Sequence, residues 1–276
     1  MLIGIVGLGL IGGSFAKAYH EAGCSVAAQD INLSTLQYAM LNRIVDQELT
    51  QDVLKDCDLI LICTYPQAAI EFLENNGAYI GKKPIVMDCC GTKRNIVDIG
   101  MEMAKKYGFT YAGAHPMAGT QYSGIKYSRA DMFRNAPMVI VPPYYDDIVL
   151  LDKMKQLLLP CGFSQLTLTT AEKHDETIAF TSQLAHVVSS AYVKSPTSRV
   201  HNGMSAGSYR DLTRVAWLSP EMWTELCMDN RDNLIRETDT LIENLNAYRS
   251  ALAAEDREQL KALFAEGKKI KEEVDG

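Results

Sequence analysis

The stretch from Leu2 to Gly13, LIGIVGLGLIGG, decides the fold. Its first residues form an apolar run typical of a buried strand, and the glycines after it are spaced Gly7-x-Gly9-x-x-Gly12. In a strand, turn and helix unit, the first glycine permits the tight turn and the second lets the backbone approach a pyrophosphate. The third lets the helix pack closely on the sheet. The stretch therefore predicts a dinucleotide-binding site.

The residues around these glycines favour NAD as the dinucleotide. The helix expected to open near Leu10 points the amides of Leu10 and Ile11, and the positive end of its dipole, at the phosphates. Ser25 to Gln29 form a second expected strand, and Asp30 comes 18 positions after the last glycine of the motif. A carboxylate at that spacing can bind the ribose hydroxyls and repels a 2′-phosphate, so we expect NAD and not NADP. Thr64, which ends another apolar run, is a further expected cofactor contact.

Short apolar runs and amphipathic segments alternate up to Thr169. The expected later strands are Asp58 to Cys63, Pro84 to Asp88, Phe109 to Ala114, Met138 to Val141 and Ser164 to Leu168. Helical segments are expected at Gln67 to Asn75, Arg94 to Tyr107 and Asp146 to Leu159. This alternation predicts parallel βαβ units in a Rossmann-type doubly wound α/β sheet over residues 1–169, with ligands beyond the carboxyl ends of the strands.

The second half of the chain, residues 170–276, has the pattern of an all-helical domain. Thr170 is expected to cap a helix that begins at Ala171 and runs to about Val193, before Ser195 and Pro196. Further helices are expected at Tyr209 to Ala216, Pro220 to Asn230, Arg231 to Ala253 and Asp256 to Glu273. Several are apolar around more than one face, which favours a homodimer formed through this domain.

Composition excludes several other classes of protein. The 276 residues carry a formal charge of −7 without a dense basic cluster, which argues against nucleic-acid binding. Apolar runs such as Leu59 to Cys63 are too short to span a bilayer, and the chain begins in an expected strand and not in a signal peptide. The seven scattered cysteines suit reduced thiols in the cytoplasm, and none has convincing zinc spacing, so we expect no metal site.

A candidate catalytic base lies in the segment Ala112 to Gly119, AGAHPMAG. His115 falls at the end of an expected strand, where a nicotinamide ring would lie, and Pro116 restricts the chain after it. A neutral imidazole there can accept a proton from a hydroxyl whose carbon loses hydride. The alternative is a histidine that only satisfies a loop carbonyl.

The helical half holds candidate substrate contacts. Gln183 and His186 are three residues apart, which brings them to one face of a helix, although His186 alone is as compatible with a buried structural histidine. Arg210 and Arg214 also share a helical face, where their like charges repel each other. An anionic substrate bound between them would make both interactions attractive. The alternative is a solvated face with Asp211 as the counter-ion.

Taken together, these motifs resemble the prephenate dehydrogenase family of the tyrosine pathway. The resemblance runs through GLGLIGGS, DCCGTK, GAHPMAGTQYSG, SQLAH, SYRDLTRVA and PEMW, and covers nearly the entire chain. It implies a nucleotide-binding domain followed by a helical domain, NAD as cofactor, and the oxidative decarboxylation of prephenate to 4-hydroxyphenylpyruvate. It also implies that His115 is the catalytic histidine, that His186 contacts the substrate, and that Arg214 binds a substrate carboxylate. Trp223 matches a tryptophan near the family's substrate pocket, although helix packing explains it equally well.

Some positions depart from the family pattern. Gly91 stands where members often carry a serine thought to steady the catalytic histidine, and the hydroxyl of Thr92 is a candidate replacement. Gln121 stands where some members have glutamate, and Gln183 where some have histidine, so the polar network at the pocket mouth can differ in charge. Thr92, Gln121, Gln183 and Arg210 complete the expected substrate contacts.

Three other functions compete with this interpretation. An arogenate dehydrogenase would meet an ammonium in place of a keto group, and the absence of an acidic residue from Leu184 to Tyr192 favours prephenate. A β-hydroxyacid dehydrogenase would use a catalytic lysine, but Lys173 and Lys194 lack the glycine-rich helical context. A non-enzymatic NAD-sensing protein would need no polar residues at the domain junction.

Overall fold

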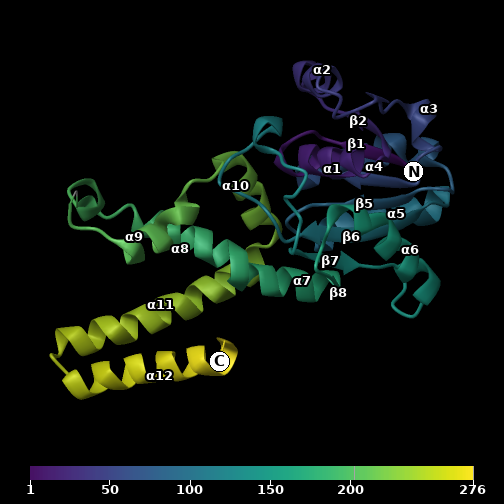
Figure 1. Cartoon of the computed structure of the whole chain (residues 1–276). Coiled ribbons are helices and arrows are strands. Elements are labelled where there is room, and N and C mark those ends of the chain that lie inside the picture. Colours follow the sequence, from purple (N-terminus) through teal and green to yellow (C-terminus); the bar gives the residue numbers. More distant parts are fainter. Residues whose placement is uncertain (202, 276) are drawn as a thin grey trace.

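An eight-stranded sheet organises the N-terminal half of the chain in the computed structural model (Figure 1). The model describes residues 1–201 and 203–275, and Asn202 and Gly276 of the expected helical domain lie outside the described residues. The strands are β1 (Leu2–Val6), β2 (Ser25–Gln29), β3 (Gln47–Glu48), β4 (Leu59–Ile62), β5 (Ile85–Asp88), β6 (Thr110–Pro116), β7 (Pro137–Val141) and β8 (Gln165–Leu168). Their spatial order, β3-β2-β1-β4-β5-β6-β7-β8, reverses direction beside β1, as the doubly wound prediction requires.

One strand pair corrects the expectation of a wholly parallel sheet. β6 and β7 run antiparallel, with His115 opposite Val139, whereas the other neighbouring strands are parallel. A parallel crossover needs a connection such as a full helix, and only the short 3-10 turn η1 (Ile125–Tyr127) lies between these strands. β6 also continues through Pro116, so His115 belongs to the strand itself.

Helices cover both faces of the sheet. On one face α1 (Leu10–Glu21), α2 (Leu33–Leu41) and α6 (Ile148–Leu158) share a hydrophobic cluster with β1, β2, β4 and β5. On the other face, α4 (Pro66–Ile80) and α5 (Arg94–Tyr107) share a second cluster with the same strands. A one-turn helix, α3 (Gln51–Leu54), precedes β4. Helix α2 was not among the helices predicted from the sequence, because its terminal residues Leu33 and Leu41 are 67% and 83% exposed and blur its amphipathic pattern.

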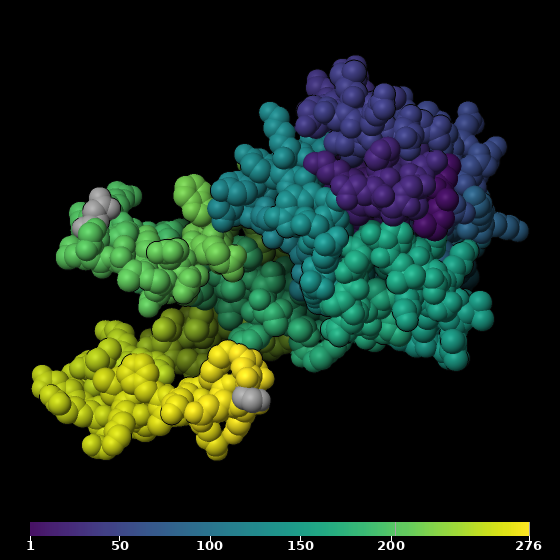
Figure 2. Space-filling model, viewed as in Figure 1, coloured from purple at the N-terminus to yellow at the C-terminus, as the bar shows by residue number. Residues whose placement is uncertain are grey.

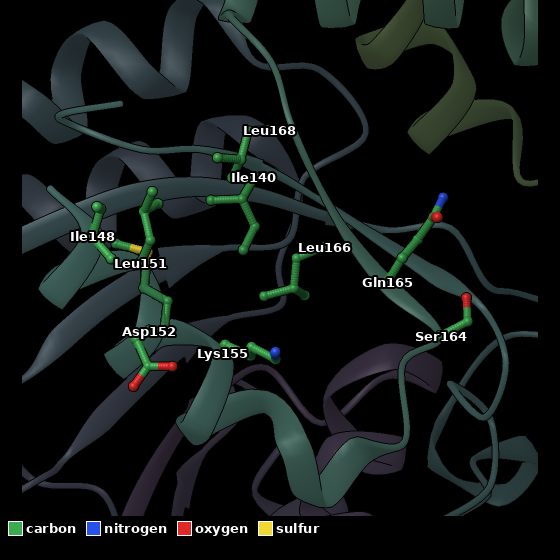
Figure 3. A pocket seen from close by; sticks show the side chains of 10 residues that line it. Ile140, Ile148, Leu151, Asp152, Lys155, Ser164, Gln165, Leu166 and Leu168 are labelled. Carbon is green, nitrogen blue, oxygen red and sulfur yellow. The ribbon is translucent and has the colours of Figure 1, made fainter. Parts of the chain in front are cut away.

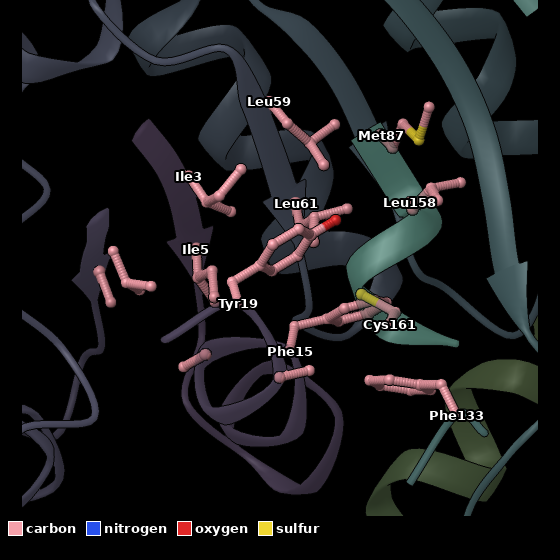
Figure 4. Packing of buried hydrophobic residues seen from close by; sticks show 14 of the residues in the cluster. Ile3, Ile5, Phe15, Tyr19, Leu59, Leu61, Met87, Phe133, Leu158 and Cys161 are labelled. Atoms are coloured by element: carbon pink, nitrogen blue, oxygen red, sulfur yellow. The ribbon is translucent and has the colours of Figure 1, made fainter. Parts of the chain in front are cut away.

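Aromatic side chains fill the core between α1 and the sheet (Figure 4). The rings of Phe15 and Phe133 stack with centroids 4.1 Å apart, and both are fully buried. Beside them the buried Tyr19 hydroxyl donates a hydrogen bond of 2.9 Å to the carbonyl of Leu157 in α6. These contacts fix α1 along its length, so the glycine-rich turn that precedes the helix is held rigidly.

The second half of the chain is helical, as expected. Thr170 caps α7 by accepting a hydrogen bond from the amide of Lys173, and a π-helical turn, η3, joins α7 to α8. The elements are α7 (Ala171–Ile178), η3 (Ala179–Leu184), α8 (Ala185–Tyr192), η4 (Pro196–Arg199), α9 (Gly207–Thr213), η5 (Arg214–Ala216), α10 (Pro220–Asp229), α11 (Arg231–Ala253) and α12 (Arg257–Asp275). The last connector of the first half is η2 (Leu159–Cys161).

The C-terminal helices α11 and α12 form a hairpin that projects from the rest of the molecule (Figure 2). Large apolar side chains at least half exposed line it: Ile235, Ile242, Leu245, Leu252, Phe264, Ile270 and Val274. None of the helices in the described ranges combines the length and apolar character needed to cross a membrane.

Candidate active site

The glycine-rich turn between β1 and α1 has the geometry that its sequence predicts. Gly7 has φ of +88°, a conformation that other residues rarely adopt. A Cβ on Gly12 would lie 1.8 Å from the carbonyl oxygen of Gly7, so only glycine allows α1 to approach the turn this closely. A Cβ on Gly9 would meet nothing within 4 Å, which leaves open space for a ligand beside the backbone.

The other expected cofactor residues surround this turn. Gly9 caps α1 without a side-chain hydrogen bond, so the amides at Leu10 and Ile11 stand at an open helix start. The carboxylate of Asp30 accepts a hydrogen bond of 2.7 Å from the amide of Leu8 in the turn, which holds this acidic group beside it. The methyl of Thr64 borders the turn, since it would lie 2.8 Å from a Cβ on Gly7. This set of residues fits a dinucleotide with an unphosphorylated ribose.

Two alanine variants should separate the roles of the glycines. Gly12→Ala forces the new methyl into backbone, so we expect a loss of about 3 kcal/mol of stability and a fall in Tm of roughly 6 to 12 °C. Gly9→Ala is expected to change stability by less than about 0.5 kcal/mol but to weaken NAD binding at least about tenfold, because the methyl occupies ligand space. Thermal unfolding and NAD titration measure both effects, and equal Tm values for the two variants would contradict the prediction.

His115 belongs to a chain of polar groups that joins the two halves of the protein. Its Nδ1 lies 2.9 Å from Nε2 of His174, and Nδ1 of His174 lies 2.7 Å from Oδ1 of Asp175. His174 and Asp175 stand in the first helix of the second half, α7, and are 3% and 1% exposed. The site residue on β6 is therefore oriented by the helical half.

The hydrogen bonds determine where the protons are. Burial alone would raise the pKa of Asp175, but hydrogen bonds from His174 and from the backbone amides of Arg94 and Lys93 lower it, so the group is a carboxylate. It must accept from Nδ1 of His174, whose Nε2 then accepts from Nδ1 of His115. Burial, and then the electrostatic influence of His174 and Lys93, lower the pKa of His115 well below its usual value. His115 is neutral, and among residues 1–201 and 203–275 no group hydrogen-bonds its Nε2, so this atom has the free lone pair that a general base requires.

A buried ion pair lies beneath this chain. Lys93 and Asp88 are both fully buried and joined by a salt bridge, and the hydroxyl of Tyr111 donates a hydrogen bond of 2.6 Å to Asp88. Asp175 also accepts from the amides of Lys93 and Arg94 at 2.7 and 3.0 Å, which ties the start of α5 to α7. The positive charge of Lys93 helps to keep His115 unprotonated.

The expected substrate histidine lies on the helical side. The ring of His186 in α8 stacks on Trp223 in α10, with centroids 3.6 Å apart and planes 26° apart. Its Nδ1 lies 2.9 Å from the carbonyl oxygen of Ser182. Arg214 is exposed at the start of η5, and its charge acts on His186, whose pKa is lowered first by burial and also by this guanidinium. An aromatic surface, an imidazole and a cation thus lie together.

The remaining expected contacts are placed differently. Gln183 faces α10, like His186, but is 1% exposed, and its amide is bonded to the carbonyl of Leu226 and to the side chain of Asn230. The hydroxyl of Thr92, expected to steady His115, donates a hydrogen bond of 3.3 Å to Asp229 instead. The side chain that holds His115 is His174.

Two of the expected contacts lie on the surface. Gln121 is exposed on the loop after β6, and Arg210 is exposed on α9. A Cβ on Gly91 would meet Leu226 at 3.1 Å, so the methylene of a serine here would press on Leu226.

Sequence reasoning missed His174 and Asp175. The available signal was an adjacent imidazole and carboxylate in the first turns of the helix that begins the second half, directly after the last strand. Their partner lies 59 residues earlier in the chain, so no local spacing reveals the contact.

A separate hollow lies at the far edge of the sheet (Figure 3). Residues from α6, β7 and β8, among them Ile148, Leu151 and Leu166, line it. It contains none of the expected site residues, so it does not compete with the junction around His115 as the active site.

Comparisons with known proteins point to one family of dehydrogenases. Residues 15–165 match the model described as the nucleotide-binding domain of prephenate dehydrogenase, and residues 170–266 match its dimerization domain. A cyclohexadienyl dehydrogenase from Zymomonas mobilis is 28% identical over 98% of this chain and 94% of its own length.

Solved structures of the same class superpose on nearly the whole molecule. Prephenate dehydrogenase from Aquifex aeolicus, in complex with hydroxyphenyl propionate and NAD+, gives a TM-score of 0.83 at 25% identity, over 100% of this chain and 98% of the other. Synechocystis arogenate dehydrogenase gives 0.80 at 26% identity, over 99% of both chains. Because the two family models together span most of the sequence, this chain belongs to the prephenate dehydrogenase family of oxidoreductases.

Proposed function

We propose that this enzyme carries out the NAD-dependent oxidative decarboxylation of prephenate to 4-hydroxyphenylpyruvate. The observation that carries the proposal is the chain from Asp175 through His174 to His115, which leaves Nε2 of His115 as a proton acceptor at the edge of the nucleotide-binding sheet. Bound NAD supplies the hydride acceptor. The Aquifex aeolicus relative, solved with NAD+, and the family's nucleotide-binding domain support this cofactor.

The protein's own groups then have distinct tasks. His115 accepts the proton of the ring hydroxyl while the carbinol carbon loses hydride, and the ring carboxylate leaves as carbon dioxide as the ring becomes aromatic. Arg214 binds the side-chain carboxylate through its planar guanidinium, and His186 contacts the group next to it. His174 and Asp175 are positioning residues, because they orient His115 without needing to touch the substrate.

Arogenate is the alternative substrate, since a prephenate dehydrogenase and an arogenate dehydrogenase both match this chain. Initial rates of NAD reduction, followed with purified enzyme and each compound separately, test the proposal. Turnover of prephenate supports it, whereas silence with both compounds would overturn it and return the chain to the wider dehydrogenase class.

We also propose that the enzyme acts as a homodimer through its helical domain and works in the cytoplasm. The match to the family's dimerization domain and the apolar hairpin of α11 and α12 support the dimer. The seven cysteines are free of disulfides, which suits a reducing compartment.

The dimer proposal predicts the effect of charges on α11. Ile242 and Leu245 are 50% and 57% exposed, so Ile242→Asp with Leu245→Asp should leave the fold intact and weaken self-association at least about thirtyfold. Sedimentation velocity across a dilution series measures this. Ile148→Asp, at a 78% exposed site on α6, is the matched control and should remain as dimeric as the parent. Equal association of both variants would place the interface elsewhere.

A further inference from the structure

Four hydrogen bonds hold the carboxylate of Asp175, which ends the chain of groups that leads to His115. Its Oδ1 accepts from Nδ1 of His174 and from the amide of Lys93, each at 2.7 Å. Its Oδ2 accepts twice from Arg94, at 3.0 Å from the backbone amide and at 3.3 Å from Nε of the guanidinium. Because Oδ1 is the oxygen that meets the imidazole, the bonds to Oδ2 set how the carboxylate is turned toward His174.

The guanidinium of Arg94 is itself held in place by the start of α11. Its Nη1 and Nη2 donate to the two carboxylate oxygens of Asp232, at 2.8 and 2.5 Å, a bidentate pairing that suits a planar guanidinium. Nη2 also donates to Oδ1 of Asn230 at 3.1 Å. Arg94 is the first residue of α5, so it joins the N-terminal half to both Asp175 and α11.

Asn230 extends this arrangement to the backbone. It is fully buried, and its Nδ2 donates at 2.8 Å both to the carbonyl oxygen of Asp175 and to Oε1 of Gln183. Its Oδ1 is the acceptor for the guanidinium of Arg94. Arg94 therefore acts on the side chain of Asp175 directly and on its backbone through Asn230.

The burial of these groups distinguishes them from an ordinary ion pair. A pair on the surface contributes little, because water competes for both charges. The side chains of Arg94 and Asp175 are 30% and 1% exposed, whereas Arg129 and Asp131 form a surface pair at 63% and 55%. A buried carboxylate that loses one of its donors is costly, so the contact with Arg94 constrains the orientation of Asp175.

We propose, resting on the function proposed above, that Arg94 is a positioning residue for the reaction, because its hold on Asp175 fixes the orientation of His115. Without the guanidinium, the carboxylate keeps its backbone donors and His174, but it gains freedom to turn, and Asn230 loses a donor as well. The two imidazoles then lose their fixed orientation. The proton acceptor spends less time facing the substrate hydroxyl, so kcat falls, whereas binding of NAD and of the substrate carboxylate is unaffected.

Substitution of Arg94 in two backgrounds tests this role. Arg94→Gln is expected to lower kcat with prephenate about tenfold in the parent enzyme, with KM and the affinity for NAD unchanged within about twofold. In an enzyme that already carries His174→Gln, the same change should lower kcat by less than about twofold, because the group through which Arg94 acts is gone. Rates are compared where kcat does not vary with pH, so that a shifted protonation does not contribute.

The surface pair provides the matched control. Arg129→Gln makes the same change at an arginine that is also bonded to an aspartate, Asp131, and it should leave kcat unchanged in both backgrounds.

The outcomes separate the two proposals. An equal fall in kcat in both backgrounds, or a kcat of Arg94→Gln that matches the parent, overturns the role of Arg94 and leaves the proposed function standing. Silence of the parent enzyme with prephenate and with arogenate overturns the function itself. If Arg94→Gln does not fold, Asp232→Asn decides, since it frees the guanidinium at a side chain that is 61% exposed. A parent-like kcat in that variant overturns the role of Arg94.

Discussion

Replacing His115 with asparagine is expected to lower kcat by about a thousandfold while leaving the affinity for NAD nearly unchanged. Asparagine keeps a polar side chain of similar reach but cannot accept a proton at the pH of the assay. The glycine-rich turn and Asp30, which we propose hold the cofactor, lie between β1 and α1 and directly after β2, whereas His115 lies on β6, so the cofactor site should survive. NAD titration and steady-state rates with prephenate measure the two quantities.

His20→Asn is the matched control, because it makes the same change at an exposed site, and it should retain full turnover. Turnover by His115→Asn within about tenfold of the parent would remove His115 from its role as base. His174→Gln should fall between the two, because it disturbs the orientation of His115 but leaves the base in place.

The parent enzyme should also keep its activity into mildly acidic solution. A base whose pKa is depressed stays deprotonated to lower pH, so the acid limb of kcat should lie below the ordinary histidine value of about 6.5. Burial comes first among the causes of this depression, followed by the electrostatic influence of His174 and of the Lys93 ammonium. If the site stabilised the protonated form of His115, the acid limb would move to higher pH. An acid limb above about pH 7 would therefore contradict the electrostatics of the site.

The parts of the fold that follow from local pattern were predictable from the sequence. The glycine spacing with an acidic residue after the second strand was enough for the nucleotide site, and Thr170 marked the start of α7. The antiparallel return between β6 and β7 was not predicted, because alternation of strands and helices does not report strand direction where a helix is missing.

The site was only partly predictable for a similar reason. His115 was singled out because it follows an apolar run, its expected role as a base came from that position at a strand end, and the family resemblance implied the same role. His174, Asp175 and Asn230 were missed, since each acts through contacts with residues far away in the sequence. Gln183 was expected at the pocket mouth, but its amide is used inside the protein by Leu226 and Asn230. Spacing places a side chain on a helix face and does not say which groups that face meets.

Replacing Arg214 with glutamine is expected to raise KM for prephenate about a hundredfold, with a much smaller change in kcat. A charge-assisted pair with a carboxylate contributes a few kcal/mol when it is shielded from water, and it acts equally in the ground state and the transition state. Arg214→Lys should recover only part of this loss, because lysine keeps the charge but not the planar fork. Arg134→Gln, at an exposed arginine of the N-terminal half, is the control and should leave KM unchanged.

The same substitution has a second consequence that an ordinary surface arginine would not produce. The guanidinium of Arg214 lowers the pKa of His186, so its removal should raise that pKa. At a given pH more of His186 is then protonated, and the midpoint of its titration should move to higher pH. Histidine NMR across the pH range measures that midpoint. A large fall in kcat at unchanged KM would show that Arg214 does not bind the carboxylate. An unmoved midpoint would show that Arg214 does not act on His186.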